Sequence, residues 1–169
     1  MYMPMPTQDK IIEVAKYFIK RSQDEAVKDP SRKLDPLKLQ KLLYYAKAWN
    51  LVLNKGHKLF SDEFQAWVHG PANPKVWRHF QSFDFSVKHP EIENENFGHI
   101  TRDEKRVLDI VWQSYGKFDG KYLEMLTHAE DPWLHARRGL NQTDVSQNVI
   151  SNESMRSYYE RRFQETART

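Results

Sequence analysis

Residues 34–56, LDPLKLQKLLYYAKAWNLVLNKG, form the segment that most constrains the fold. Asp35 is suited to cap the start of a helix, and Pro36 takes the first helical position, where its missing N–H does no harm. Gly56 provides a natural C-terminal stop. Between these signals, apolar side chains occupy nearly every side of the predicted helix. A helix that is apolar nearly all round is usually central, so we expect other helices to pack on it from two sides.

The rest of the chain predicts mainly further helices. Apolar residues recur at helical spacing, and capping residues precede several of these segments. Thr7 is the expected cap of the first helix, while Thr101 and Glu104 have the spacing of a capping box. Helices are expected after Thr7, over residues 34–56, from 74 to about 82, and over 101–116, 119–130, 131–139 and 148–163, the last after a short extended piece.

One segment has the pattern of a strand. In residues 57–70, apolar residues alternate with others, namely Phe64, Ala66 and Val68 with Gln65, Trp67 and His69. The pair Gly70-Pro71 then predicts a turn, and Asn73 before Pro74 predicts the start of the next helix. The chain is therefore expected to end a strand, turn and begin a helix within very few residues.

Two segments predict loops instead. Residues 21–33 are polar, and residues 84–100 are loop-like with at most a second short strand. No internal repeat interrupts the chain. We therefore expect a mainly α fold, a single compact helical domain of about six or seven helices with a small β-strand or hairpin element. This domain would comprise residues 1–169, with a core from about 7 to 164.

Composition excludes several classes of protein. The chain has no cysteine, which excludes disulfides, thiolate metal sites and cysteine nucleophiles. Its 26 basic and 23 acidic residues are mostly interspersed and give a net charge of +3, whereas nucleic-acid binders usually carry a clustered basic face. The start, MYMPMPTQDK, lacks the pattern of a secretory signal, and no apolar run approaches the roughly 20 residues that span a bilayer. We expect a cytoplasmic protein with no membrane partner.

Seven histidines raise the question of a metal or catalytic site. No H-E-x-x-H motif occurs, and Pro132 interrupts the best local cluster, which comprises His128, Glu130, Asp131 and His135. The motifs of serine hydrolases and of phosphate-binding loops are also absent from the sequence. The sequence therefore predicts no catalytic residue, no metal ligand and no cofactor. A hydrolase centred on His128 and Glu130 is kept as a third alternative.

Aromatic residues near turns point instead to macromolecular recognition. Trp67 lies on the strand face opposite Phe64 and Ala66, so either both faces are covered or Trp67 is partly exposed, as suits a protein interface. The C-terminal stretch MRSYYERRFQETART combines arginines with aromatics, although glutamates dilute its charge. A nucleic-acid-binding regulator that uses this basic C-terminal helix is therefore the second alternative.

Four stretches together resemble one family. They are LDPLKLQKLLYYAKAW (34–49), GHKLFSDEFQAWVHGPANPKVW (56–77), LTHAEDPWLHAR (126–137) and ISNESMRSYYERRF (150–163). In this order they resemble the Panacea domain of SocA-like antitoxins and of phage-associated proteins of the GepA kind. Two residues depart from the family pattern, since His69 stands where tyrosine is common and Ala72 where valine is common.

The resemblance implies a mostly helical fold with a small β element and no established catalytic activity. It implies an antitoxin-like protein, not an enzyme, that neutralises a cognate toxin by direct binding and is encoded in a toxin–antitoxin, prophage or mobile-element locus. For members that act as proteolytic adaptors, an ATP-dependent protease is a further partner. The expected interface residues are Trp67, His69 and Pro71, with His128 and Trp133 as a second group, and maintenance of the fold is the alternative role for all five.

Overall fold

The computed structural model describes residues 9–167 and confirms the mainly α fold class. Within that range lie eight α-helices, one 3-10 helix and three short strands. The helices are α1 (Lys10–Glu25), η1 (Pro30–Arg32), α2 (Pro36–Leu53), α3 (Pro74–Phe80), α4 (Pro90–Glu93), α5 (Arg102–Tyr115), α6 (Gly120–His128), α7 (Asp131–Ala136) and α8 (Asn152–Ala167). The strands are β1 (Phe64–Trp67), β2 (Gly70–Ala72) and β3 (Val149–Ile150).

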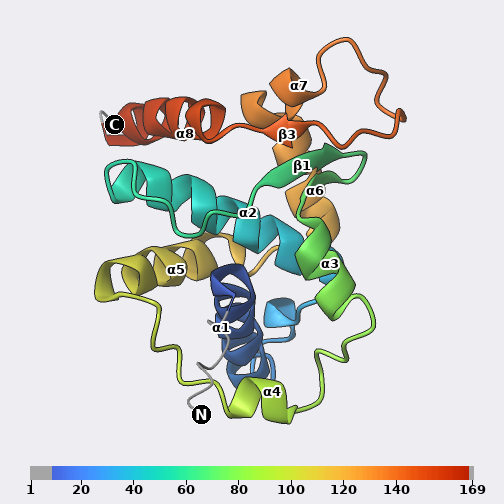
Figure 1. The fold of residues 1–169 in the computed structure, drawn as a ribbon. Coiled ribbons are helices and arrows are strands. Elements are labelled where there is room, and N and C mark those ends of the chain that lie inside the picture. The colour runs from blue at the N-terminus through green and yellow to red at the C-terminus, as the bar shows by residue number, and fades with distance from the viewer. Residues whose placement is uncertain (1–8, 168–169) are drawn as a thin grey trace, which may run out of the picture.

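Helix α2 runs through the centre of the molecule, as its apolar circumference predicts (Figure 1). The Asp35 side chain caps it by accepting from the Lys38 N–H at 2.8 Å. Helices α5 and α1 pack on one side of α2 and α8 on the other (Figure 1). Four leucines and both tyrosines of α2 are buried as a result, and they form the middle of a single hydrophobic core; they are Leu39, Leu42, Leu43, Leu51, Tyr44 and Tyr45.

The three strands form one small antiparallel sheet with β1 in the middle. Pairing of Trp67 with Gly70 makes β1 and β2 a hairpin whose turn is Val68 and His69. The prediction of a turn at Gly70-Pro71 was therefore wrong, because both residues belong to β2. Gly70 has a φ of 100°, a conformation that favours glycine, and a Cβ there would lie 2.7 Å from Lys41 Cε, so a larger residue would also displace Lys41.

The N-terminal helix differs from its prediction at both ends. The expected cap, Thr7, lies outside the described residues, and the helix begins at Lys10. It then continues to Glu25, through residues that the sequence assigned to a loop. Arg21 Nε donates to Glu25 at 2.7 Å, and Trp112 Nε1 donates to the same carboxylate at 3.1 Å. These contacts stabilise the last, polar turn of α1, which the local composition does not predict to be helical.

The segment 84–100 holds a one-turn helix, α4, and no strand. This turn is the element that raises the helix number above the expected six or seven. His89 caps it, because its Nδ1 accepts from the Glu91 N–H at 3.1 Å. No helix between residues 9 and 167 combines the length and the hydrophobicity that crossing a bilayer requires.

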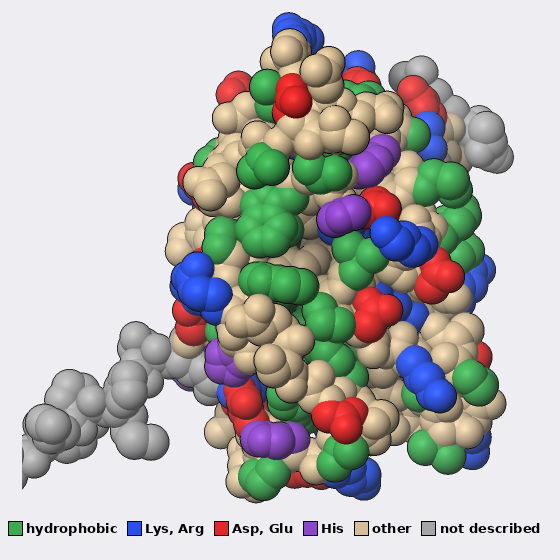
Figure 2. Space-filling view, turned by 90° about the vertical axis from the view of Figure 1, so that its right-hand side faces the viewer, with side chains coloured by type: hydrophobic (Ala, Val, Ile, Leu, Met, Phe, Trp, Pro, Cys, Tyr) green, Lys and Arg blue, Asp and Glu red, His purple; other side chains and the backbone are tan. Residues whose placement is uncertain are grey.

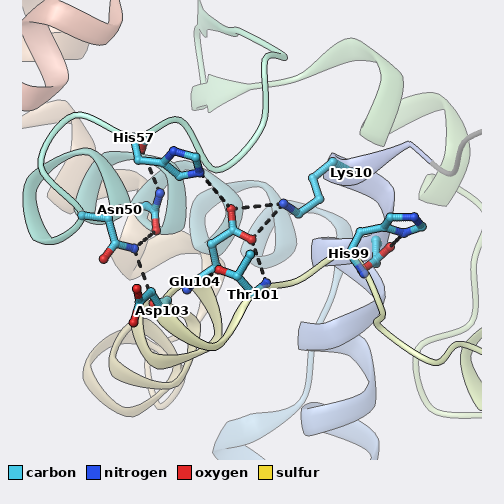
Figure 3. Close-up of polar contacts among 9 residues, drawn as sticks. Lys10, Asn50, His57, His99, Thr101, Asp103 and Glu104 are labelled. Atoms are coloured by element: carbon cyan, nitrogen blue, oxygen red, sulfur yellow. Dashed lines mark hydrogen bonds and ion pairs between the residues drawn. The ribbon is translucent and has the colours of Figure 1, made fainter.

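A buried carboxylate fastens α1 and α5 together (Figure 3). Glu104 and Thr101 form the predicted capping box at the start of α5. The Glu104 carboxylate also accepts from Lys10 Nζ of α1 at 2.9 Å and lies 3.5 Å from His57 Nε2. Burial raises the pKa of Glu104, but the Thr101 N–H and the Lys10 ammonium lower it to below its usual value. This cluster is a structural cross-link, because these contacts occupy its carboxylate.

Candidate partner-binding site

The β1–β2 hairpin, α3, α6 and the first half of α2 enclose a pocket of about 310 Å³. Figure 2 shows this side of the molecule, where hydrophobic side chains gather around a hollow. Its lining comprises Leu37, Gln40, Lys41, Trp67, His69, Gly70, Ala72, Trp77 and Lys121. Apart from its lysines the lining is largely apolar, and it is open to a partner. We call it the hairpin pocket.

Two tryptophans from different elements line the hairpin pocket. Trp67 is half-buried at the end of β1, and its Nε1–H donates to Gln65 Oε1 at 2.8 Å. Trp77 is 40% exposed, because Val76 and Phe80 of the same short helix take the positions that face the core. Partly exposed tryptophans beside an apolar hollow are typical of protein-recognition surfaces.

The junction between β2 and α3 is fixed by a buried side chain of α2. Gln40 Nε2 donates to the Asn73 carbonyl at 3.0 Å, and Gln40 Oε1 accepts from the Asn73 N–H at 2.8 Å. The Asn73 side chain in turn caps α3 by accepting from the Val76 N–H at 3.0 Å. Trp77 therefore lies on a short helix whose first residues are fixed by Gln40 and by the Asn73 cap.

The two predicted groups of interface residues meet at the hairpin. Trp133, which is 3% exposed, donates from Nε1 to the Trp67 carbonyl at 2.8 Å. The half-buried His128 stacks on Trp133 with a 4.0 Å centroid separation. Trp67 and the exposed His69 thus lie at the surface, whereas His128 and Trp133 form the layer that supports them. Pro71 is also buried, and its carbonyl accepts from Lys41 Nζ at 3.0 Å.

Lys41, like Trp77, belongs to this site but was not among the residues predicted from the sequence. Its side chain is 1% exposed, and it lines the hairpin pocket. Burial lowers the pKa of Lys41 to about 7, while Glu124 and Asp35 oppose this fall and Lys121 adds to it. The Lys41 ammonium therefore titrates near neutral pH in the floor of an apolar pocket.

The rim of the hairpin pocket carries a small charged group. His69 Nδ1 lies 2.7 Å from Glu124 Oε1, and Lys121 Nζ lies 3.5 Å from the other oxygen of that carboxylate. Burial raises the pKa of Glu124, but His69 and Lys121 lower it to below its usual value. The rim is thus polar around an apolar centre, which is the usual anatomy of a protein interface.

His128 and Glu130 do not form one site. Burial lowers the pKa of His128, although the nearby Glu124 carboxylate opposes this change. Glu130 instead accepts from the hydroxyls of Tyr45 at 2.7 Å and Tyr159 at 2.9 Å, and burial raises its pKa. Among residues 9–167, no group of three or more histidines and carboxylates is placed to hold a metal ion. The geometry gives the hydrolase alternative no support.

The C-terminal helix does not form a basic face. The described length of α8 contains three arginines and three glutamates. Arg156 lies 3.8 Å from Glu160, and Arg161 lies 3.6 Å from Asp131 of α7. The charge that suggested nucleic-acid binding is therefore largely balanced within this part of the protein.

Comparison with known proteins identifies the family. A family model described as "Antitoxin SocA-like, Panacea domain" matches residues 39–134, more than half of the chain. No curated protein and no solved structure matches this chain. The matched segment contains the hairpin, α3, α6 and most residues of the hairpin pocket, whereas α8 lies outside it. The chain belongs to the SocA-like antitoxin family, whose shared unit is the Panacea domain.

Proposed function

We propose that this protein neutralises a cognate toxin by direct binding, and that the face around the hairpin pocket makes the contact. The observation that carries the proposal is the pair of accessible tryptophans, Trp67 and Trp77, around an apolar pocket. This pocket lies almost entirely within the segment that matches the antitoxin family. His69 contributes to the polar rim, while Pro71, His128 and Trp133 support the surface from below.

Physical scale supports this choice of surface. A stable protein–protein interface buries about 1,600 Å² in total, and a few aromatic or charged anchors supply most of its free energy. The hairpin pocket offers two such aromatic anchors with a charged rim. Binding of this kind needs no cofactor and no chemical turnover. We therefore propose a binding role and not an enzymatic one.

The finer parts of the proposal concern partners and context. We propose that the toxin is encoded beside this gene, in a toxin–antitoxin, prophage or mobile-element locus. If the protein is also a proteolytic adaptor, its co-expression will shorten the half-life of the toxin in cells that contain the relevant ATP-dependent protease. Simple neutralisation leaves that half-life unchanged or longer.

Co-expression with the neighbouring gene product tests the function. We expect the wild-type chain to restore growth of cells that the neighbour arrests, and to bind the purified neighbour. Trp77→Ala should weaken this binding by about 2 kcal/mol, roughly thirtyfold, because a central tryptophan anchor is lost. Its thermal midpoint should change little, because Trp77 is 40% exposed. Binding is measured by titration calorimetry and folding by circular dichroism.

Phe163→Ala is the matched control. Phe163 is an aromatic residue of α8 that is 46% exposed, outside the family-matched segment and away from the hairpin pocket. It should bind and rescue like the wild type. Growth arrest that persists with the wild-type chain present would contradict the proposed function. Equal losses in Trp77→Ala and Phe163→Ala would contradict the assignment of this face.

A further inference from the structure

A buried ammonium in the hairpin pocket lacks a charged partner. Within the described residues, Lys41 Nζ makes one hydrogen bond, to the Pro71 carbonyl at 3.0 Å, although an ammonium has three donors. No carboxylate of residues 9–167 lies within ion-pair distance of this nitrogen. A buried charge with so few partners is costly, and proteins keep such groups mainly where they serve function.

Other buried lysines of α2 are better satisfied or lie elsewhere. Lys38 Nζ donates to two carbonyls, those of Ser31 at 2.8 Å and Gly116 at 2.6 Å. Lys47 Nζ donates to the Asp62 carbonyl and lies over the Phe60 ring. Neither lysine lines the hairpin pocket. Lys41 is therefore the buried lysine of this helix that lines the hairpin pocket.

The groups around Lys41 leave its positive charge uncompensated at close range. The nearest carboxylate of the rim, Glu124, is engaged by His69 and Lys121. The titratable and charged groups around Lys41 are Asp35, which caps α2, His69 on the hairpin, and Lys121, Glu124 and His128 on α6. The chemistry that completes this site is an anionic oxygen delivered through the pocket mouth.

The size and lining of the pocket indicate which kind of ligand could bring a carboxylate to Lys41. The pocket has a volume of about 310 Å³, which accommodates a large side chain, and most of its wall is apolar. A free polypeptide C-terminus brings a carboxylate and an apolar side chain into the same place on one residue. An internal aspartate or glutamate would need a second side chain to cover Trp67, Trp77 and Leu37.

We propose that the hairpin pocket binds the C-terminal residue of a partner polypeptide, with its α-carboxylate on Lys41 and its apolar side chain against Trp67 and Trp77. This inference rests on the proposed function, because it names the part of the partner that the pocket recognises. It also explains Gly70, whose missing Cβ leaves the room that Lys41 Cε and Nζ occupy, at 2.7 and 3.1 Å from that position.

Binding is then linked to proton uptake. The free protein has a Lys41 pKa of about 7, so the amine is largely neutral above that pH, whereas a bound carboxylate needs the ammonium. Between pH 6.5 and pH 8.5 the affinity for a carboxylate should therefore fall about twentyfold. The α-carboxylate of the ligand is ionised at both values and contributes nothing to this change.

Synthetic peptides test the inference directly on the full-length protein. The probes are an N-acetylated pentapeptide that ends in leucine, the same peptide as its C-terminal amide, and an amide with an internal aspartate before the leucine. Titration calorimetry and tryptophan fluorescence measure binding at pH 6.5 and 8.5. We expect the free acid to bind at least about tenfold more tightly than either amide at pH 6.5.

Two lysine variants serve as a matched pair. Lys41→Met should abolish the preference for the free acid and its pH dependence, whereas Lys47→Met should keep both. Both changes remove a buried ammonium of α2, so a general effect on folding would appear in the two alike. His69→Gln should retain the pH dependence, which separates the effect of Lys41 from that of the rim.

Several results would overturn the inference. They are equal binding of acid and amide, equal binding of the internal aspartate peptide, and an unchanged preference in Lys41→Met. A dimer of the protein that Lys41→Met dissociates would identify a second copy as the occupant and would also overturn it. Toxin neutralisation is scored separately by growth rescue. Rescue by Lys41→Met at wild-type level would refute the inference and leave the proposed function standing.

Discussion

Three lysines of α2 are buried, and each holds a loop by donating to a main-chain carbonyl. Lys38 donates to carbonyls before α2 and after α5. Lys41 donates to a carbonyl of the hairpin, and Lys47 to one in the segment before β1. Burial lowers the pKa of Lys41 to about 7 and those of the other two to about 8. These residues tie α2 to its surroundings at a cost in desolvation.

The stability of the protein should therefore rise with pH above neutrality. The unfolded chain keeps its lysine protons up to about pH 10.5, whereas folded Lys41 releases its proton near pH 7, so the unfolded state binds more protons in this window. Lys41 alone should contribute about 2 kcal/mol of additional stability between pH 7 and pH 9. Urea unfolding at both pH values should show that Lys41→Met lacks this part of the rise.

Exposed Lys105 of α5 provides the control for that measurement. Lys105→Met should show the same rise in the free energy of unfolding as the wild type. If Lys41→Met rose as steeply as Lys105→Met, then Lys41 would not titrate in the expected range. The pH dependence of binding to the hairpin pocket would lose its explanation at the same time.

The candidate site was only partly predictable at the residue scale. Alternation along β1 left open whether Trp67 is covered or partly exposed, and the structure shows it half-buried. Trp77 lies on an exposed side because Val76 and Phe80, four residues apart, share the buried face, a spacing that could have revealed it. Lys41 had no such signal, because a lysine within a helix ordinarily indicates a solvent-facing position.

At the scale of elements, α8 is attached by very few buried side chains. Only Met155 and Tyr159 are buried among its described residues. The Tyr159 ring contacts those of Tyr44 and Tyr45, and its hydroxyl lies 2.9 Å from the buried Glu130. A lone helix of this length is marginal in water, so docking through Tyr159 holds α8 in its helical form.

Tyr159→Ala should consequently release α8 while the rest of the protein stays folded. The loss of a buried aromatic ring costs about 3–5 kcal/mol and leaves Met155 as the only buried side chain of the described helix. Hydrogen–deuterium exchange read by mass spectrometry should show α8 amides exchanging freely and α2 amides still protected. Phe163→Ala, on the exposed side of the same helix, should leave both protected. Uniform deprotection in Tyr159→Ala would show that α8 unfolds only with the whole molecule.

The starts of three helices were predicted correctly because a capping side chain precedes each of them. Asp35, Asn73 and Thr101 each accept from the main-chain N–H three residues on, as their sequence positions predict. The end of α1 was missed because it depends on Trp112 of α5, which donates to Glu25. These two residues are far apart in the sequence, so no local pattern predicts their contact. The hairpin turn was misplaced because Gly70, which usually marks a turn, is needed in β2 for close approach of Lys41.

At the scale of the whole molecule, charge is spread widely while the hairpin pocket is mostly apolar. The net charge is only +3 over 169 residues. Several arginines and lysines of residues 9–167 lie within 4 Å of a carboxylate, including Arg156 and Arg161 of α8. A molecule with this distribution is suited to bind another protein through a shaped surface, and it presents no extended basic face on α8 for a phosphate backbone.

Salt dependence separates these two modes of recognition. A surface that neutralises six or more phosphates loses a thousandfold or more in affinity between 50 and 200 mM salt. The hairpin pocket instead offers an apolar wall, one buried lysine and a small rim of paired charges. Toxin affinity should therefore change less than about tenfold over that range. Fluorescence anisotropy with the labelled toxin and with a random DNA duplex measures both ligands under the same conditions. Tight binding to the duplex at 50 mM salt that collapses by 200 mM, and that Arg162→Ala weakens, would instead favour the regulator that acts through α8.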